Sequence, residues 1–81
     1  MKVLFYTKDH CSLCDDAMAF LYMLERDFHF DIEERDIYTN DTWLAEYQLR
    51  IPVVEVNGEQ LDCEGMSYEA LADLLKRAAH E

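Results

Sequence analysis

The sequence predicts an α/β fold, a four-stranded mixed sheet with three helices, in the order βαβαββα. Three observations predict it. An apolar run at residues 3–6 gives way near Ser12 to apolar residues spaced three or four apart, the pattern of a buried strand followed by an amphipathic helix. Asn57-Gly58, between two alternating segments, is a strong hairpin signal. A second helical stripe follows Ser67 and closes the chain.

The first two elements follow from a change of period. VLFY at 3–6 suits a strand buried on both faces. The first helix is expected to pack one apolar stripe on the sheet. Ser12, Asp15 and Asp16 suit its first turn, where oxygen acceptors and negative charge are favoured. The stripe consists of Leu13, Ala17, Leu21, Leu24 and Phe28, with Cys14 and Met18 beside it.

The middle of the chain carries weaker signals. Alternation of Phe28, Phe30 and Ile32 with polar residues predicts a second strand that begins near His29 or Asp31. Its end is left open, because the segment EERD interrupts the pattern. The segment TNDT then offers a helix start, and the short apolar face that follows consists of Trp43, Leu44 and Tyr47.

The last elements close the sheet. Pro52 lacks a backbone N–H and so is expected at the start or edge of a strand over 53–56. The hairpin joins it to a partner near 59–63. Ser67 is expected to cap a final helix with a buried stripe and a basic last turn. The strand, helix and strand at the beginning predict a right-handed parallel crossover, and the hairpin adds antiparallel strands.

The composition limits the class of protein. The 81 residues predict one domain, 1–81, and the hydrophobic content of 51% is ample for a core. We find no apolar stretch that suits a signal peptide or membrane span, and so expect a cytoplasmic protein. The net charge of −11 disfavours nucleic acid and anionic membranes as partners. Whether the acidity serves solubility or a basic partner stays open.

The segment KDHCSLCDD, residues 8–16, carries the chemistry. Cys11 and Cys14 lie where a strand ends and a helix begins, and backbone N–H groups at a helix start stabilise a thiolate. Cys11 is expected to attack a substrate disulfide, and Cys14 to resolve the mixed disulfide. Asp15 and Asp16 oppose the thiolate, whereas Lys8 and His10 partly offset them.

Other interpretations of the cysteines remain open. Both members of the pair are also compatible with small buried hydrophobic residues. A zinc site would need two more ligands, for which His10, His29 and Cys63 are the candidates. Cys63 itself is either a small residue at a strand end or a third redox thiol near the pair.

Two separated motifs resemble the glutaredoxins. FYTKDHCSLC is similar to their active-site segment, and RIPVVEVNG to their segment around a cis-proline. The resemblance implies that Pro52 is cis and lies against the cysteine pair, and that the Ile51 backbone pairs with a peptide or glutathione. It places Lys8 near the thiolate or a glutathione carboxylate. Within this resemblance, the chain looks most like small bacterial glutaredoxin-like proteins.

The chain departs from glutaredoxins at the expected glutathione-binding segment. Asp62 and Cys63 stand where Gly-Gly is usual, and Arg50 stands where threonine is common. Side chains at 62 and 63 would crowd or repel glutathione, which leaves dithiol chemistry intact but puts glutathione binding in question.

The sequence therefore predicts a monomeric thiol–disulfide oxidoreductase that uses Cys11 and Cys14. Its expected substrates are protein or small-molecule disulfides, with glutathione as the candidate co-substrate and no bound metal or organic cofactor. One rival hypothesis is a non-catalytic adaptor that binds a basic protein. Another is a metal carrier that uses Cys11, Cys14 and Cys63.

Overall fold

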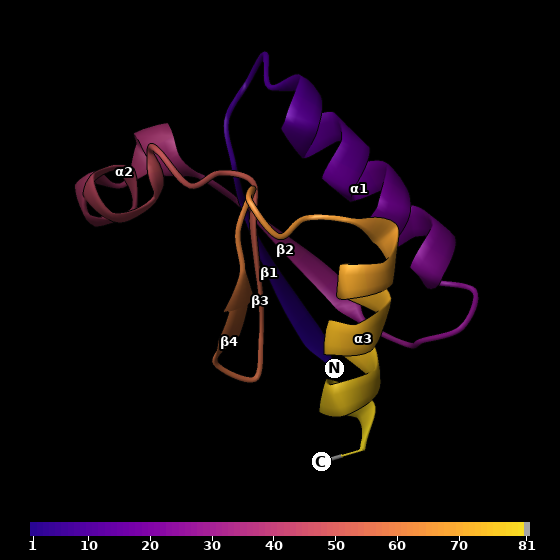
Figure 1. The fold of residues 1–81 in the computed structure, drawn as a ribbon. Helices are drawn as coiled ribbons and strands as arrows, with labels where there is room; N and C mark the ends of the chain where they lie inside the picture. The colour runs from indigo at the N-terminus through magenta and orange to yellow at the C-terminus, as the bar shows by residue number, and fades with distance from the viewer. Residues whose placement is uncertain (81) are drawn as a thin grey trace.

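The computed structural model describes residues 1–80, which form a four-stranded mixed sheet with strand order β2-β1-β3-β4 (Figure 1). β1 runs parallel to β2 and antiparallel to β3, and β3 runs antiparallel to β4. The predicted fold class is confirmed. The strands are β1 (Lys2–Thr7), β2 (Asp31–Asp36), β3 (Val53–Val56) and β4 (Glu59–Leu61).

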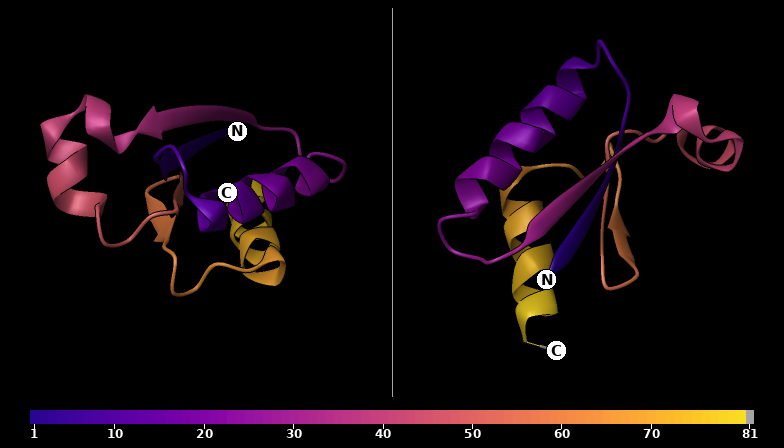
Figure 2. Two further views of the ribbon diagram at one scale, coloured as in Figure 1. Left: turned by 90° about the horizontal axis from the view of Figure 1, so that it is seen from above. Right: turned by 180° about the vertical axis from the view of Figure 1, so that it is seen from behind.

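The helices cover the two faces of the sheet unequally. α1 (Ser12–Leu24) and α3 (Tyr68–Ala79) lie together on one face, and α2 (Asp41–Tyr47) lies toward the other (Figure 2). A short 3-10 helix, Ile37–Thr39, precedes α2. Within residues 1–80, no helix is long and apolar enough to cross a membrane.

The larger core cluster lies between the sheet and the α1/α3 pair. Alternate residues of β1 and β3 enter it because successive side chains of a strand point to opposite faces. Its buried members are Val3, Phe5, Cys14, Ala17, Leu21, Leu24, Val54, Val56, Leu71, Leu74 and Leu75. This cluster fixes the start of α1, and therefore the cysteine pair, against the sheet.

A smaller aromatic cluster lies under α2. The Tyr6 ring stacks at a tilt on Tyr47 at 4.1 Å and meets the edge of Trp43 at 5.9 Å. The Arg35 guanidinium lies over the rings of Tyr6 and Trp43 and donates to the Tyr6 hydroxyl at 2.8 Å. Burial, followed by the Tyr47 hydroxyl, raises the pKa of Tyr6 above its ordinary value, although Arg35 opposes the rise.

The first helix differs from its predicted stripe at both ends. Cys14, Ala17, Leu21 and Leu24 are the buried residues, so Leu13 falls about 100° away from Cys14 around the axis and is 59% exposed. The helix ends at Leu24, and Phe28 packs against the larger core cluster from the turn beyond it. The predicted stripe was therefore wrong for Leu13, and for Phe28 as a helical residue.

β2 runs through the EERD segment that interrupts its sequence pattern. Because β2 is an edge strand, its polar side chains find partners on the sheet surface rather than a core. Glu33 accepts from Lys2 at 2.8 Å and from Arg35, and these two bonds lower the pKa of Glu33 from its ordinary value. Cross-strand charge pairs thus stabilise a strand without apolar alternation.

The hairpin and the last helix largely follow their signals. Asn57 and Gly58 both have positive φ, 53° and 81°, as the tight turn requires. β4 ends at Leu61, however, so residues 62 and 63 lie in a turn and not in the predicted strand. Ser67 caps α3 by accepting the Ala70 N–H at 3.0 Å.

Candidate functional site

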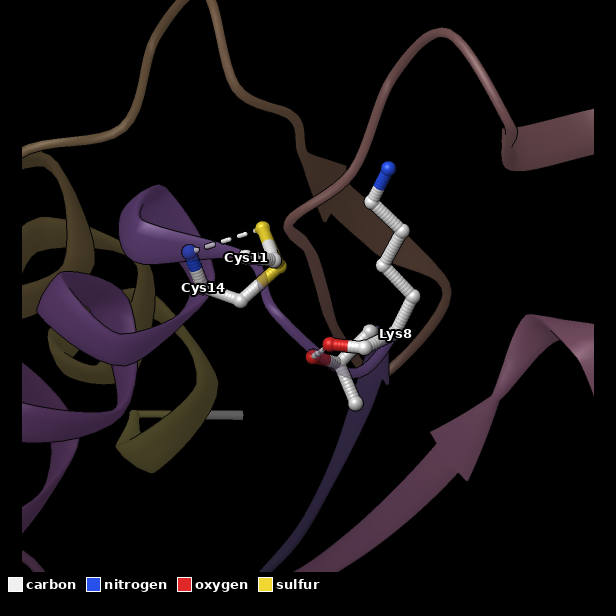
Figure 3. Close-up of a disulfide and its surroundings, with 4 residues drawn as sticks. Lys8, Cys11 and Cys14 are labelled. Atoms are coloured by element: carbon white, nitrogen blue, oxygen red, sulfur yellow. Dashed lines mark hydrogen bonds between the residues drawn. A yellow bond between two sulfur atoms is a disulfide. The ribbon is translucent and has the colours of Figure 1, made fainter.

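The cysteine pair lies between the carboxyl end of β1 and the start of α1, as expected. Cys11 and Cys14 form a disulfide with Cα atoms 5.2 Å apart (Figure 3). Cys14 is buried at 2% exposure, whereas Cys11 is half-buried and lies at the edge of the larger core cluster. Of the two sulfur-bearing residues, Cys11 is therefore the more accessible.

Cys11 is also the N-cap of α1. Its backbone is extended, and its sulfur accepts the backbone N–H of Cys14 at 3.2 Å (Figure 3). The sequence suggested Ser12, Asp15 and Asp16 for this turn but not Cys11 as the cap. In the reduced protein, the same N–H and the positive end of the helix would stabilise a thiolate on this sulfur.

The segment before the pair forms a small acidic hollow. His10 has a positive φ of 55°, which turns the chain from β1 toward α1. The hollow measures about 370 Å³, and its lining consists of Thr7, Lys8, Asp9, His10, Asp15, Glu34 and Asp36. Asp15 thus brings negative charge into the first turn of α1, next to the cap.

Lys8 lies at the same end of the sheet but is not directed at the sulfurs. In the view of Figure 3 its side chain runs upward on the far side of the segment that leads into β3, and its ammonium nitrogen does not point at the sulfur atoms. Lys8 is exposed, and no carboxylate among residues 1–80 holds it in an ion pair. Its reach toward a bound substrate depends on side-chain rotation.

The segment leading into β3 lies on the open side of the pair. The peptide bond between Ile51 and Pro52 is cis, and Pro52 is buried. Ile51 packs against the same core cluster as Cys11, and in the view of Figure 3 this segment passes between the disulfide and Lys8. The Ile51 N–H donates to the Tyr47 carbonyl at 3.1 Å, so this N–H is already occupied within the protein.

Arg50 connects three elements around this segment. Its guanidinium contacts Glu46 at the end of α2 at 3.2 Å, Gln60 of β4 at 3.1 Å and the Asp62 carboxylate at 3.6 Å. Its carbonyl accepts the Cys63 N–H at 3.0 Å, so Asp62 and Cys63 are held beside the chain that leads to Pro52. Sequence reasoning noted Arg50 only as a departure. The i, i+4 spacing from Glu46 was the one signal for its pairing.

Metal ligands do not converge in the described part of the chain. No group of three or more His, Cys, Asp or Glu side chains is arranged to hold a metal ion in residues 1–80. Cys63 is a free thiol of intermediate burial. The three-cysteine set of the metal-carrier hypothesis therefore has no cluster to support it there.

Comparison with known proteins agrees with this geometry. A family model described as Glutaredoxin-like domain (DUF836) matches residues 2–76. The solved structure of the structural genomics target XcR50 from X. campestris is 28% identical, with 94% of this chain and 97% of that chain covered and a TM-score of 0.77.

Thioredoxin 1 from Thermosipho africanus TCF52B shares the fold at 20% identity. The match covers 99% of this chain and 96% of that chain, with a TM-score of 0.75. The family match spans nearly the whole chain, including both the cysteine pair and the cis-proline segment. The chain belongs to the family of the Glutaredoxin-like domain (DUF836).

Proposed function

We propose that the protein is a thiol–disulfide oxidoreductase with Cys11 as nucleophile and Cys14 as resolving thiol. The observation that carries this proposal is the Cys11–Cys14 disulfide at the start of α1, in which the accessible sulfur accepts a helix N–H. Because Cys14 is buried, a substrate disulfide meets Cys11 first. The burial of the second sulfur therefore supports the order of the two attacks.

The reaction proceeds by two exchanges. The Cys11 thiolate attacks one sulfur of a substrate disulfide; a Cys11–substrate disulfide forms and the first substrate thiolate leaves and takes a proton. The Cys14 thiol then loses its proton and attacks the Cys11 sulfur, which releases the second substrate thiol. Two electrons pass from the protein to the substrate. An external thiol reductant reverses both steps and restores the dithiol.

The surroundings favour a peptide or protein disulfide as substrate. Leu13, between the cysteines, is 59% exposed, and Leu49, just before Arg50, is 90% exposed. Both offer apolar contact to a peptide chain, and the Ile51 carbonyl offers a hydrogen-bond acceptor. We further propose that the chain acts as a monomer in the reducing cytoplasm, where such a dithiol is regenerated.

Glutathione is the candidate reductant that most needs a direct test. Asp62 adds a carboxylate beside the cis-proline segment, although Arg50 partly neutralises it. Glutathione is itself anionic, so we expect its reaction with the Cys11–Cys14 disulfide to be slow. The Asp62→Ala variant, in which Arg50 loses this partner, should react faster with glutathione, whereas Glu64→Ala serves as the neighbouring control.

Single cysteine variants test the assignment. Cys11→Ser should abolish reduction of a model peptide disulfide, Cys14→Ser should accumulate a mixed disulfide at Cys11, and Cys63→Ser should retain the activity. Mass spectrometry after acid quenching identifies the trapped species. Activity that survives in Cys11→Ser, or a trap that forms at Cys63, would refute the proposed roles.

A further inference from the structure

A groove outside the cysteine site separates α1 from the free edge of the sheet. It measures about 650 Å³ and lies between α1, the segment at 25–30 and β2. In the right panel of Figure 2, which shows the molecule from behind, α1, the loop that follows it and β2 can be traced in order. The lining consists of Met1, Met18, Tyr22, Glu25, Phe28, His29, Phe30, Asp31, Ile32 and Glu34.

Most of the groove lies toward the opposite end of β1 and β2 from the cysteines, although Glu34 lines both the groove and the hollow beside the cysteine pair. Met1 and Asp31, which line the groove, are at the amino ends of these two parallel strands, whereas the pair follows the carboxyl end of β1. A ligand in the groove therefore leaves Cys11 accessible.

The groove is apolar at its base and open to water. Met18, Phe28, Phe30 and Ile32 are only half-buried, although they pack against the larger core cluster. Tyr22 is 60% exposed on the outer side of α1. Contiguous apolar side chains left open in this way mark interaction surfaces more often than isolated exposed residues do.

The strand beside the groove has an unpaired edge. β2 pairs with β1 on one side, and no strand within residues 1–80 pairs with its other side. The outward N–H and C=O groups of such an edge are a template for one more strand. A strand added there would run beneath the overhanging side chains of α1, so its alternate residues would enter the groove.

The negative charge of the groove indicates which kind of ligand it binds. Glu25, Asp31 and Glu34 line the groove, and the whole chain carries −11. A second copy of this chain would bring the same negative charge and be repelled. A segment rich in Lys or Arg would instead be attracted and oriented.

We propose that the free edge of β2 and this groove bind an extended basic segment of another protein. The backbone of that segment pairs with β2, and its alternate side chains enter the groove. On this face, apolar side chains fill the centre of the groove, and Lys or Arg side chains next to them reach Glu25 and Glu34, which also line it. This mode is strand addition, in which backbone hydrogen bonds give affinity and side-chain pockets give specificity.

Three synthetic peptides of equal length and charge test the mode. The probe has Val and Leu at its central groove-facing positions, Lys at the groove-facing positions on either side of them, and Thr at the alternate positions. The second peptide has Ser in place of the apolar residues, and the third is the probe with N-methylated amides on its sheet-pairing edge. NMR titration of the whole chain should show shifts at residues 28–34 and in α1 with the probe, and at least about tenfold weaker binding of the other two.

Matched variants test the surface. Glu34→Lys and Tyr22→Ser should each weaken the probe about fivefold or more, because one reverses a rim charge and the other removes an apolar wall. Asp73→Lys, a change of the same charge on α3 outside the groove, should not. Cys11→Ser should bind the probe normally, so failure of the redox function leaves this test unaffected.

Equal binding of all three peptides would show charge attraction alone and overturn the proposal. Shifts centred away from β2, or equal weakening by Asp73→Lys and Glu34→Lys, would overturn it as well.

Discussion

A thiol is an unusual helix cap, and the capping sulfur of Cys11 is also the proposed nucleophile. Ser, Thr, Asp and Asn bond the first-turn N–H groups better than sulfur does. The residue at this position is therefore suited to reactivity more than to helix stability. For the same reason Cys11→Ser should keep α1 intact, so its loss of activity reports chemistry and not unfolding.

Asp15 acts on the thiolate and on the helix in opposite directions. Its carboxylate in the first turn stabilises α1 through the helix dipole but opposes a negative sulfur at Cys11. Asp15→Asn should therefore raise the alkylation rate of Cys11 by iodoacetamide at neutral pH by a factor of roughly two to five. The free energy of unfolding should fall by about 0.3–1 kcal/mol.

Asp73→Asn removes the same charge from α3 and serves as the control for both measurements. An unchanged alkylation rate in Asp15→Asn would mean that solvent screens this charge from the sulfur.

In the candidate site, the sequence predicted the positions of residues that belong to a local sequence pattern. The cysteine pair and its place after a strand follow from one short segment. The outward direction of Leu13 depends on the helix phase, which the buried Cys14 sets. The Arg50 network depends on β4 and the turn at Asp62 coming back to the end of α2, a contact that no local pattern contains.

At the scale of elements, α2 is held by aromatic rings and a few polar bonds. The Tyr47 hydroxyl accepts from the Gln60 side chain at 2.9 Å, which links α2 to β4. Tyr47→Phe keeps the ring against Tyr6 but removes the bond to Gln60 and the interaction of the Tyr47 hydroxyl with the Tyr6 hydroxyl. It should lower the free energy of unfolding by about 0.5–1.5 kcal/mol in urea denaturation.

Tyr38→Phe is the matched control, because Tyr38 is 65% exposed in the 3-10 helix before α2. Its effect should stay within about 0.5 kcal/mol. Equal losses in the two variants would show that the interactions of the Tyr47 hydroxyl contribute nothing measurable to stability.

The order of elements was predictable because their types come from period and turn chemistry. The residues at which these elements end were not predictable wherever tertiary contacts determine them. β2 continues through EERD because Lys2 and Arg35 pair with Glu33 across and along the sheet. Strand propensity does not predict that β2 continues through this segment, because charged residues are poor strand formers.

The whole molecule carries a net charge of −11 on 81 residues. Repulsion among its negative side chains therefore destabilises the folded state. Raising the NaCl concentration screens this repulsion over distances of about a Debye length, about 10 Å at 0.1 M. The thermal midpoint should therefore rise between low salt and 0.3 M NaCl. A midpoint that falls would show that ion pairs such as Arg77–Glu59, 2.8 Å apart, outweigh the net repulsion.

The two ends of the sheet are suited to two roles. The cysteine pair follows the carboxyl end of β1, and the acidic groove begins at the amino ends of β1 and β2 and extends along β2 to Glu34. A basic segment held at the second end leaves the first free for exchange. The adaptor and the oxidoreductase hypotheses are thus compatible in one molecule.

The most direct test of the central claim is a redox titration in glutathione buffers, followed by alkylation and peptide mapping of all three cysteines. The account predicts a reversible Cys11–Cys14 disulfide that forms within roughly −320 to −220 mV, the range of the cytosolic glutathione poise. It also predicts that Cys63 alkylates throughout. A pair that stays reduced across the range, or that oxidises irreversibly, would contradict the account.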